Sequence, residues 1–301
     1  MRTSTKALLA ALVSNTAFGL SFLFVKVALD RAVPTVLLTI RFILAFAILS
    51  LLLLTGKQKA SFRGKPTGKL IIMSLIEPVL YYVCETKGVG LTSASFSGVM
   101  IALIPVVGLV LGVIFLKEKA TVLQVVCTVL SVVGVAMTTT GGMGTFSLEG
   151  FLWLMGAVLS ASVFTVLSRS LSTVFTPFER TYMMTAVGTV IFPAFSLFYN
   201  RKDPSVWLEP LGDPVFWGAV AFLTIMCSVC GFLLLNYTIN HMKVGHALVL
   251  ANLTCVVSVL AGIFILGDSF TLMQLAGIVV IILSVFGVTW QSGHTAEEPH
   301  A

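Results

Sequence analysis

Long apolar runs dominate this 301-residue chain. A helix needs about 20 predominantly apolar residues to cross the hydrocarbon core of a bilayer, and ten runs approach or exceed that length. Since lipid-exposed backbone must satisfy its own hydrogen bonds, each run is predicted to be an α-helix. The sequence therefore predicts an all-α polytopic membrane protein with ten transmembrane helices. The predicted spans are residues 7–29, 34–54, 70–87, 93–116, 121–140, 150–170, 177–199, 214–239, 245–266 and 271–290.

Charged residues are too few to cover a water-facing surface. They make up 10% of the chain and hydrophobic residues 57%, whereas a soluble domain carries about 25% charged residues. The apolar runs and their short links leave no room for a soluble catalytic module. The sequence also contains no HExxH motif, no clustered aspartates and no GxxxxGK followed by Ser or Thr. We therefore expect no enzyme activity, no cofactor and no energy supply from a bound nucleotide.

The cysteines and the net charge exclude two further classes of protein. The five cysteines all lie inside apolar runs, and their odd number argues against a disulfide framework. Cys227 and Cys230 form a CxxC without flanking ligands, so we expect helix packing there and no metal site. The formal charge is +6, but the basic residues lie singly or in short links, so they do not predict nucleic-acid binding.

The basic residues predict an orientation in the membrane, because cytoplasmic links are enriched in lysine and arginine. If both termini are cytoplasmic, twelve basic residues lie on the inner side and five on the outer side. We therefore expect a multi-pass protein of the plasma or inner cell membrane. The inner residues are Arg2, Lys6, Lys57, Lys59, Arg63, Lys65, Lys69, Lys117, Lys119, Arg169, Arg180 and Lys243, and the outer ones are Lys26, Arg31, Lys87, Arg201 and Lys202.

The chain repeats itself. Gly112, Leu116, Thr121 and Gln124 recur 150 residues later, and Pro34 recurs as Pro177. Five spans per repeat is an odd number, so the second repeat must enter the membrane from the opposite face, as in many secondary transporters. The predicted organisation is two inverted five-helix repeats, residues 1–140 and 141–290, followed by a polar cytoplasmic tail at 291–301.

Both halves carry a recognisable pattern. Residues 91–126 read LTSASFSGVMIALIPVVGLVLGVIFLKEKATVLQVV, and residues 248–277 echo them with LVLANLTCVVSVLAGIFILGDSFTLMQLAG. Nearer the front lie Lys26, Pro34 and an RFxxA element that begins at Arg41. Together these features, which span residues 7–290, resemble the EamA-type half of the drug/metabolite transporter superfamily. The resemblance implies ten helices around a central cavity and, in most members, export of amino acids, other metabolites or toxic compounds.

The sequence departs from the family pattern at a few positions. Pro105 has no proline partner in the second half, where Cys255 stands, and the glycine retained as Gly277 is replaced by Cys127 in the first half. The usual acidic residue becomes Asp268. We therefore expect the two halves to flex and pack differently.

The third predicted span carries two acidic residues. Glu77 lies about 10 Å from the inner edge of the span and is followed by Pro78, which removes a backbone donor. Glu77, Tyr81 and Glu85 recur at helical spacing and line one stripe. A charge inside a membrane needs a partner, a wet cavity or a function. The stripe could bind a cationic or zwitterionic solute or exchange protons; alternatively, Glu77 bonds a neighbouring hydroxyl and Glu85 reaches outward.

The first predicted span offers a second polar stripe. Asn15 and Lys26 lie about three turns apart on one face, with Phe18 and Phe22 between them. This face is predicted to meet the same cavity. The alternative is ordinary helix packing, with Lys26 reaching the outer headgroups along its aliphatic stem. Arg41, inside the second span, is expected to reach the surface or to pair with an acid.

Amides and small residues complete the candidates. Asn236 and Asn252 lie within the eighth and ninth spans as possible ligands, although amides also hold helices together by hydrogen bonds. Gly108 and Gly112 form a GxxxG whose repeat partners are Ser258 and Gly262. Small residues at this spacing predict close packing between the fourth and ninth helices, or between protomers.

These features predict a secondary transporter that works by alternating access, with the repeats rocking about a central site. The predicted site lies between the first, third, fourth, sixth, eighth and ninth spans. Family resemblance favours an exporter of a small metabolite such as an amino acid or a toxic analogue. An importer or exchanger of the same fold, or a passive channel, are the alternatives. The expected partners are a small-molecule solute and the lipid bilayer, and no nucleic acid is expected. Coupling to an ion gradient such as protons, exchange and downhill flux are left open, as is the oligomeric state.

Overall fold

The fold is described from a computed structural model. It describes residues 3–101, 103–117, 121–139, 147–203, 205–242, 247, 250–251, 253–266, 271–273, 275–281 and 283–284.

The first half begins with two long helices, α1 (Thr3–Leu29) and α2 (Pro34–Leu54). A broken helix follows, made of α3 (Thr67–Ser74), the π-helical turn η1 (Leu75–Leu80) and α4 (Tyr81–Leu91). The fourth predicted span consists of two pieces, α5 (Ala94–Ile101) and α6 (Ile104–Leu116), and the fifth is α7 (Val122–Thr139).

The second half repeats this order. It begins with α8 (Leu148–Leu171) and α9 (Pro177–Tyr199), and the short turns α10 (Ser205–Leu208) and η2 (Glu209–Gly212) follow. The next helix is again interrupted by a π-helical segment, in the order α11 (Pro214–Phe222), η3 (Leu223–Gly231) and α12 (Phe232–His241). Next come α14 (Leu253–Leu266) and helical residues within 272–284.

The all-α class is confirmed. Six helical stretches of the described residues are long and apolar enough to cross a membrane, and shorter apolar helices lie at Val106–Leu116, Val122–Gly134 and Leu253–Ile265. Each falls on a predicted span. The count of ten spans stays a prediction.

Local sequence signals explain where several helices begin. Pro34 and Pro177 each occupy the first turn of a helix, where a missing N–H costs nothing. Before Pro177, Thr176 and Glu179 form a reciprocal capping box, which satisfies two free N–H groups at the start of α9. The side chain of Asp213 accepts from two backbone N–H groups at the start of α11.

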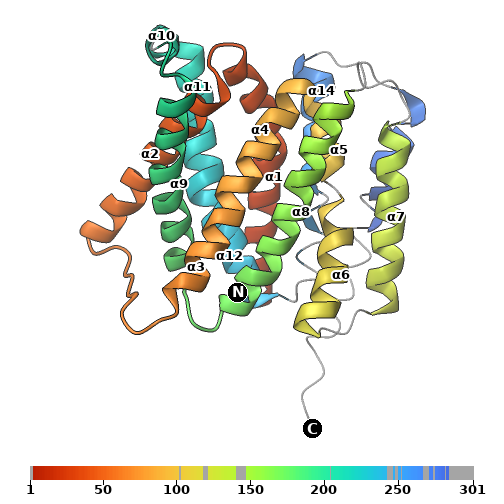
Figure 1. Ribbon diagram of the computed structural model, residues 1–301. Helices are drawn as coiled ribbons and strands as arrows, with labels where there is room; N and C mark the ends of the chain where they lie inside the picture. The colour runs from red at the N-terminus through yellow and green to blue at the C-terminus, as the bar shows by residue number, and fades with distance from the viewer. Residues whose placement is uncertain are drawn as a thin grey trace.

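The helices pack as a bundle (Figure 1). The first helix of each half packs on the third and fourth spans of the other half. In the first half, α1 packs on η3, α12 and α14 of the second half; α8, which occupies the equivalent place, packs on η1, α4 and α6. The second helices of the two halves, α2 and α9, pack on each other. In Figure 1, α10 lies at one end of the bundle and the link between α2 and α3 at the other. A two-repeat fold fits this pattern.

Candidate functional site

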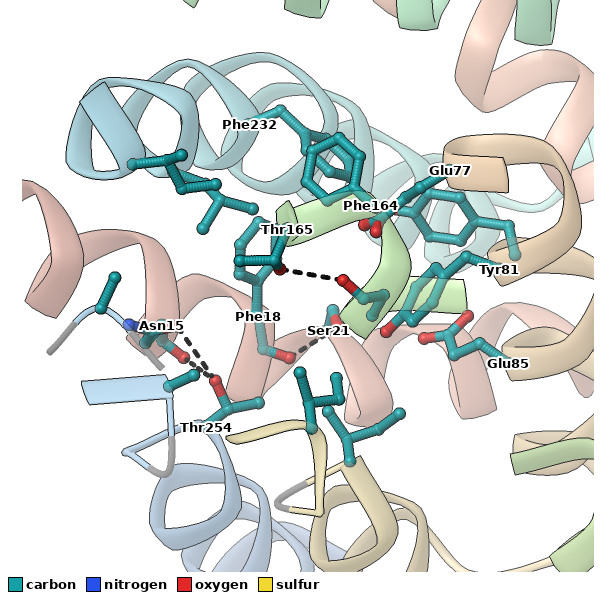
Figure 2. A pocket seen from close by; sticks show the side chains of 18 of the residues that line it. Asn15, Phe18, Ser21, Glu77, Tyr81, Glu85, Phe164, Thr165, Phe232 and Thr254 are labelled. Atoms are coloured by element: carbon teal, nitrogen blue, oxygen red, sulfur yellow. Dashed lines mark hydrogen bonds between the residues drawn. The ribbon is translucent and has the colours of Figure 1, made fainter. Parts of the chain in front are cut away.

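The described residues surround a central cavity of about 90 Å³ (Figure 2). Its walls come from α1, η1, α4, α5, α6, α8, α12 and α14, together with Ala247 and Ala251. These segments belong to the six spans between which the sequence places a central site. Asn15, Phe18, Phe22, Glu77, Tyr81 and Glu85, which are candidates from the first and third spans, all line it.

The acidic wall forms where the third span breaks. Pro78 lies inside the helical stretch, and Glu77 has extended backbone angles (φ −139°, ψ 114°). Glu77 and Glu85 nevertheless both line the cavity, as the helical stripe predicted. Glu85 is 1% exposed, so it does not reach outward, and one of its carboxylate oxygens accepts from Thr86 Oγ1 at 3.3 Å. Glu77 is 5% exposed, and its Oε2 has no hydrogen-bond partner among the described residues.

Three hydroxyl groups among the lining residues are already hydrogen-bonded. Ser21 Oγ donates to Phe18 O at 2.6 Å, and Thr165 Oγ1 donates to Ala161 O at 2.9 Å. Thr254 Oγ1 donates to the backbone oxygen of Asn15 at 3.1 Å, which joins α14 to α1 (Figure 2). The protons of these hydroxyl groups are therefore already committed to backbone oxygens, and the groups can act only as acceptors for a ligand.

Aromatic rings form much of the rest of the wall. Phe18 and Phe232 meet edge to face with their ring centroids 5.6 Å apart, and Phe164 meets Phe232 in the same way at 6.4 Å. Tyr81 and Tyr82 are adjacent and perpendicular. Such pairs offer both flat faces and edges to an apolar ligand.

Arg41 lies behind this wall and does not reach the surface. It is 1% exposed, and its Nε donates to Ser228 Oγ while its Nη2 donates to Tyr82 Oη, both at 2.8 Å. The guanidinium carbon also sits 4.4 Å from the centroid of the Tyr82 ring. The interpretation that Arg41 reaches the membrane surface is wrong, because these partners satisfy the side chain inside the bundle.

Lys26 is not brought into the cavity. Its Nζ donates to the carbonyl oxygens of Val89 at 3.1 Å and Thr92 at 2.7 Å, at the end of α4. Arg169, the equivalent residue of the second half, donates to the carbonyl of Ile239 near the end of α12. The last carbonyls of a helix lack partners within the helix, and a cation there also complements the helix dipole.

Asn236 also lies outside the cavity, in a buried polar network. Its Oδ1 accepts from Ser168 Oγ at 2.8 Å, and its amide donates to Thr181 Oγ1 at 3.0 Å. Its backbone oxygen accepts from the fully buried Arg180. This network ties α8, α9 and α12 together. Asn252 lies outside the described residues.

The small residues of the two repeat motifs lie at two different contacts between helices. Gly108 and Gly112 are buried on α6, which packs mainly on α8. Ser258 and Gly262 are buried on α14, and Ser258 donates to Ala94 O of α5 at 2.9 Å. The close approach between the fourth and ninth spans is at Gly98, where an added Cβ would lie 2.3 Å from Ser258 Oγ. The sequence motif did not single out Gly98.

Sequence reasoning missed several lining residues of the second half, including Phe164, Thr165, Phe232 and Thr254. For α8, the internal repeat could have identified lining residues. At the offset that relates Pro34 to Pro177, Phe18 maps to Ala161 and Phe22 to Thr165. Among the described residues, no group of three or more His, Cys, Asp or Glu side chains is placed to hold a metal ion.

Comparison with known proteins gives consistent results along the chain. The EamA-like transporter family matches residues 5–140 and 148–290. The chain is 32% identical to "Uncharacterized transporter YcxC" of Bacillus subtilis (strain 168), covering 94% of this chain and 92% of that protein. A WAT1-related protein of Arabidopsis thaliana is 22% identical, with 77% and 68% covered.

A solved crystal structure shares the fold. The superposition has a TM-score of 0.75 and covers 93% of this chain and 98% of that one, at 17% sequence identity. The sequence match to both halves, the similarity to a bacterial relative over nearly its full length and the shared fold agree with one another. The chain belongs to the EamA-like transporter family and is a membrane transporter.

Proposed function

We propose that this protein is a secondary exporter of a small organic solute and that the central cavity is its binding site. The observation that carries the proposal is the cavity itself, which is lined by equivalent helices of both halves and contains two buried carboxyl groups. Polar groups placed inside a membrane protein mark solute or ion pathways. Transporters built from inverted repeats bind their substrates at the repeat interface near the midplane. Family resemblance favours export over import or exchange.

Among the described residues, two ion pairs between the halves support alternating access. At the end of the bundle near α10, Arg31 Nε lies 2.9 Å from Asp213 Oδ2. At the other end, Lys65 Nζ lies 2.6 Å from Glu179 Oε2. Each pair joins the first half to the second, so opening either end requires one of them to break. The Arg31–Asp213 pair is partly exposed, and such a pair contributes only about 0–1 kcal/mol, which suits a contact that forms and breaks in every cycle.

The proposal predicts saturable flux with counterflow. Purified protein in liposomes loaded with an unlabelled substrate should transiently accumulate the labelled form above its outside concentration, since a carrier returns loaded in both directions. Candidate solutes should include amino acids and toxic analogues, which the family resemblance implies, and organic amines. Flux that rises linearly with concentration and shows no counterflow would support a passive channel instead.

The orientation is a further prediction. Lys59 and Lys202 are exposed in links at opposite ends of the bundle. If both termini are cytoplasmic in the cell membrane, an impermeant thiol reagent should label Lys202→Cys in intact cells and Lys59→Cys only after permeabilisation. The parent protein, whose own cysteines lie in helices, gives the background level of labelling. The reverse labelling pattern would invert the proposed topology.

A further inference from the structure

The polar groups of the cavity mostly accept hydrogen bonds. Glu77 and Glu85 contribute carboxyl groups. The hydroxyl protons of Ser21, Thr165 and Thr254 are all directed to backbone oxygens, which leaves their lone pairs available. A ligand that fits this set must bring its own donors.

Few of the described lining residues offer a hydrogen-bond donor. Within the described part of the chain, the remaining donors are the second amide N–H of Asn15 and the phenols of Tyr81 and Tyr82, all of them neutral. None of the described lining residues carries a positive charge. Arg41 stands behind Tyr82 and directs two of its N–H groups to Tyr82 and Ser228. A ligand carboxylate would therefore meet no cationic side chain among the described lining residues and would face two acidic side chains.

Glu77 is the polar group most in need of a partner. Its Oε2 is buried, belongs to a cavity-lining residue and has no hydrogen-bond partner among the described residues. Figure 2 shows Glu77, Tyr81 and Glu85 on one side of the cavity, across from Asn15 and Thr254. A buried oxygen without a partner costs free energy, which a bound donor would remove. An ammonium group supplies three donors and no acceptor.

The aromatic residues of the wall suit the apolar part of an amine ligand. Phe18, Phe164 and Phe232 line the cavity together with these polar groups. Aromatic faces attract a cation, and aromatic edges and faces bury an apolar body. We propose that the cavity selects a protonated organic amine without a carboxylate, with Glu77 accepting hydrogen bonds from the ammonium group and the phenylalanine rings enclosing the apolar part. The inference deepens the proposed function and rests on it for the claim that the amine is transported.

Binding to the purified protein tests this selection directly. Four probes share one phenyl body: 2-phenylethylamine, L-phenylalanine, 3-phenylpropanoate and 2-phenylethanol. At pH 7 an alkylamine is protonated, as the lysine side chain is. The amine is expected to bind at least tenfold more tightly than each of the other three, measured by isothermal titration. Butylamine, butyrate and butanol repeat the comparison with a smaller body. Equal or tighter binding of the amino acid, the acid or the alcohol, or no binding of either amine, would overturn the inference.

Counterflow in proteoliposomes with the same labelled probes separates this inference from the proposed function. Binding and counterflow of an amine support both. An amine that binds as expected but shows no counterflow leaves the selection standing and contradicts transport of that class. Counterflow of a solute without an amine, combined with no amine binding, leaves the carrier standing and removes the amine selection.

Discussion

Replacing Glu77 with glutamine is expected to reduce gradient-driven transport at least tenfold. Glutamine keeps the shape of the side chain but can neither offset a positive charge nor release a proton. A hydrogen bond to a charged group contributes about 1.5–3 kcal/mol, and about 1.4 kcal/mol corresponds to a tenfold change in affinity. The initial rate and KM of uptake into proteoliposomes measure the loss. The matched control is Glu209→Gln, since Glu209 is exposed and lies outside the cavity, and it is expected to match the parent.

Exchange without an ion gradient identifies what Glu77 does. If its carboxylate binds an amine, the variant should lose affinity in exchange as well as in gradient-driven uptake. If it carries the coupling proton, the variant should still exchange substrate for substrate but should no longer respond to a pH gradient. A Glu77→Gln protein equal to the parent in both assays would show that Glu77 is a structural carboxyl group and would remove it from the site.

The sequence was sufficient to predict the helices and one side of the cavity. Apolar length placed the spans, and a period of 3.6 residues placed Glu77, Tyr81 and Glu85 on one stripe that the structure directs into the cavity. Glu77 still lines the cavity with Tyr81 and Glu85, although its own backbone is extended before Pro78. Periodicity describes the face of a single helix, and the neighbours of that face come from helices far away in the sequence.

Because periodicity does not identify the neighbours of a helix face, two of the candidate residues lie outside the cavity. Lys26 shares a face with Asn15, but it lies at the end of α1. There, carbonyl oxygens at the end of α4 accept hydrogen bonds from its Nζ. Asn236 meets Ser168 and Thr181 from two other helices. Polarity within an apolar run predicts that a group needs a partner. It does not predict whether the partner is a ligand, a helix end or another side chain.

The same limit applies to the small residues, and the contact at Gly98 provides a stability test. Gly98→Ala is expected to destabilise the protein by about 1–3 kcal/mol, the usual cost of overpacking. The new Cβ would lie 2.3 Å from Ser258 Oγ and 2.4 Å from Ser258 Cβ, so α5 and α14 would have to separate. The control is Gly218→Ala in α11, where an added Cβ meets nothing within 4 Å. Alanine is the better helix former, so this control should be as stable as the parent or slightly more stable.

Combining Gly98→Ala with Ser258→Gly should recover most of the lost stability, because the methyl group then occupies the space that the serine side chain leaves. The recovery will be incomplete, since the hydrogen bond from Ser258 to Ala94 is lost, and such bonds between membrane helices contribute about 0.6 kcal/mol on average. Unfolding midpoints in detergent of the parent, both single variants and the double variant form a double-mutant cycle. A positive coupling places the close approach of the fourth and ninth spans at Gly98 and Ser258. Additive losses would show that the two residues do not touch and would contradict a close approach of the fourth and ninth spans at Gly98.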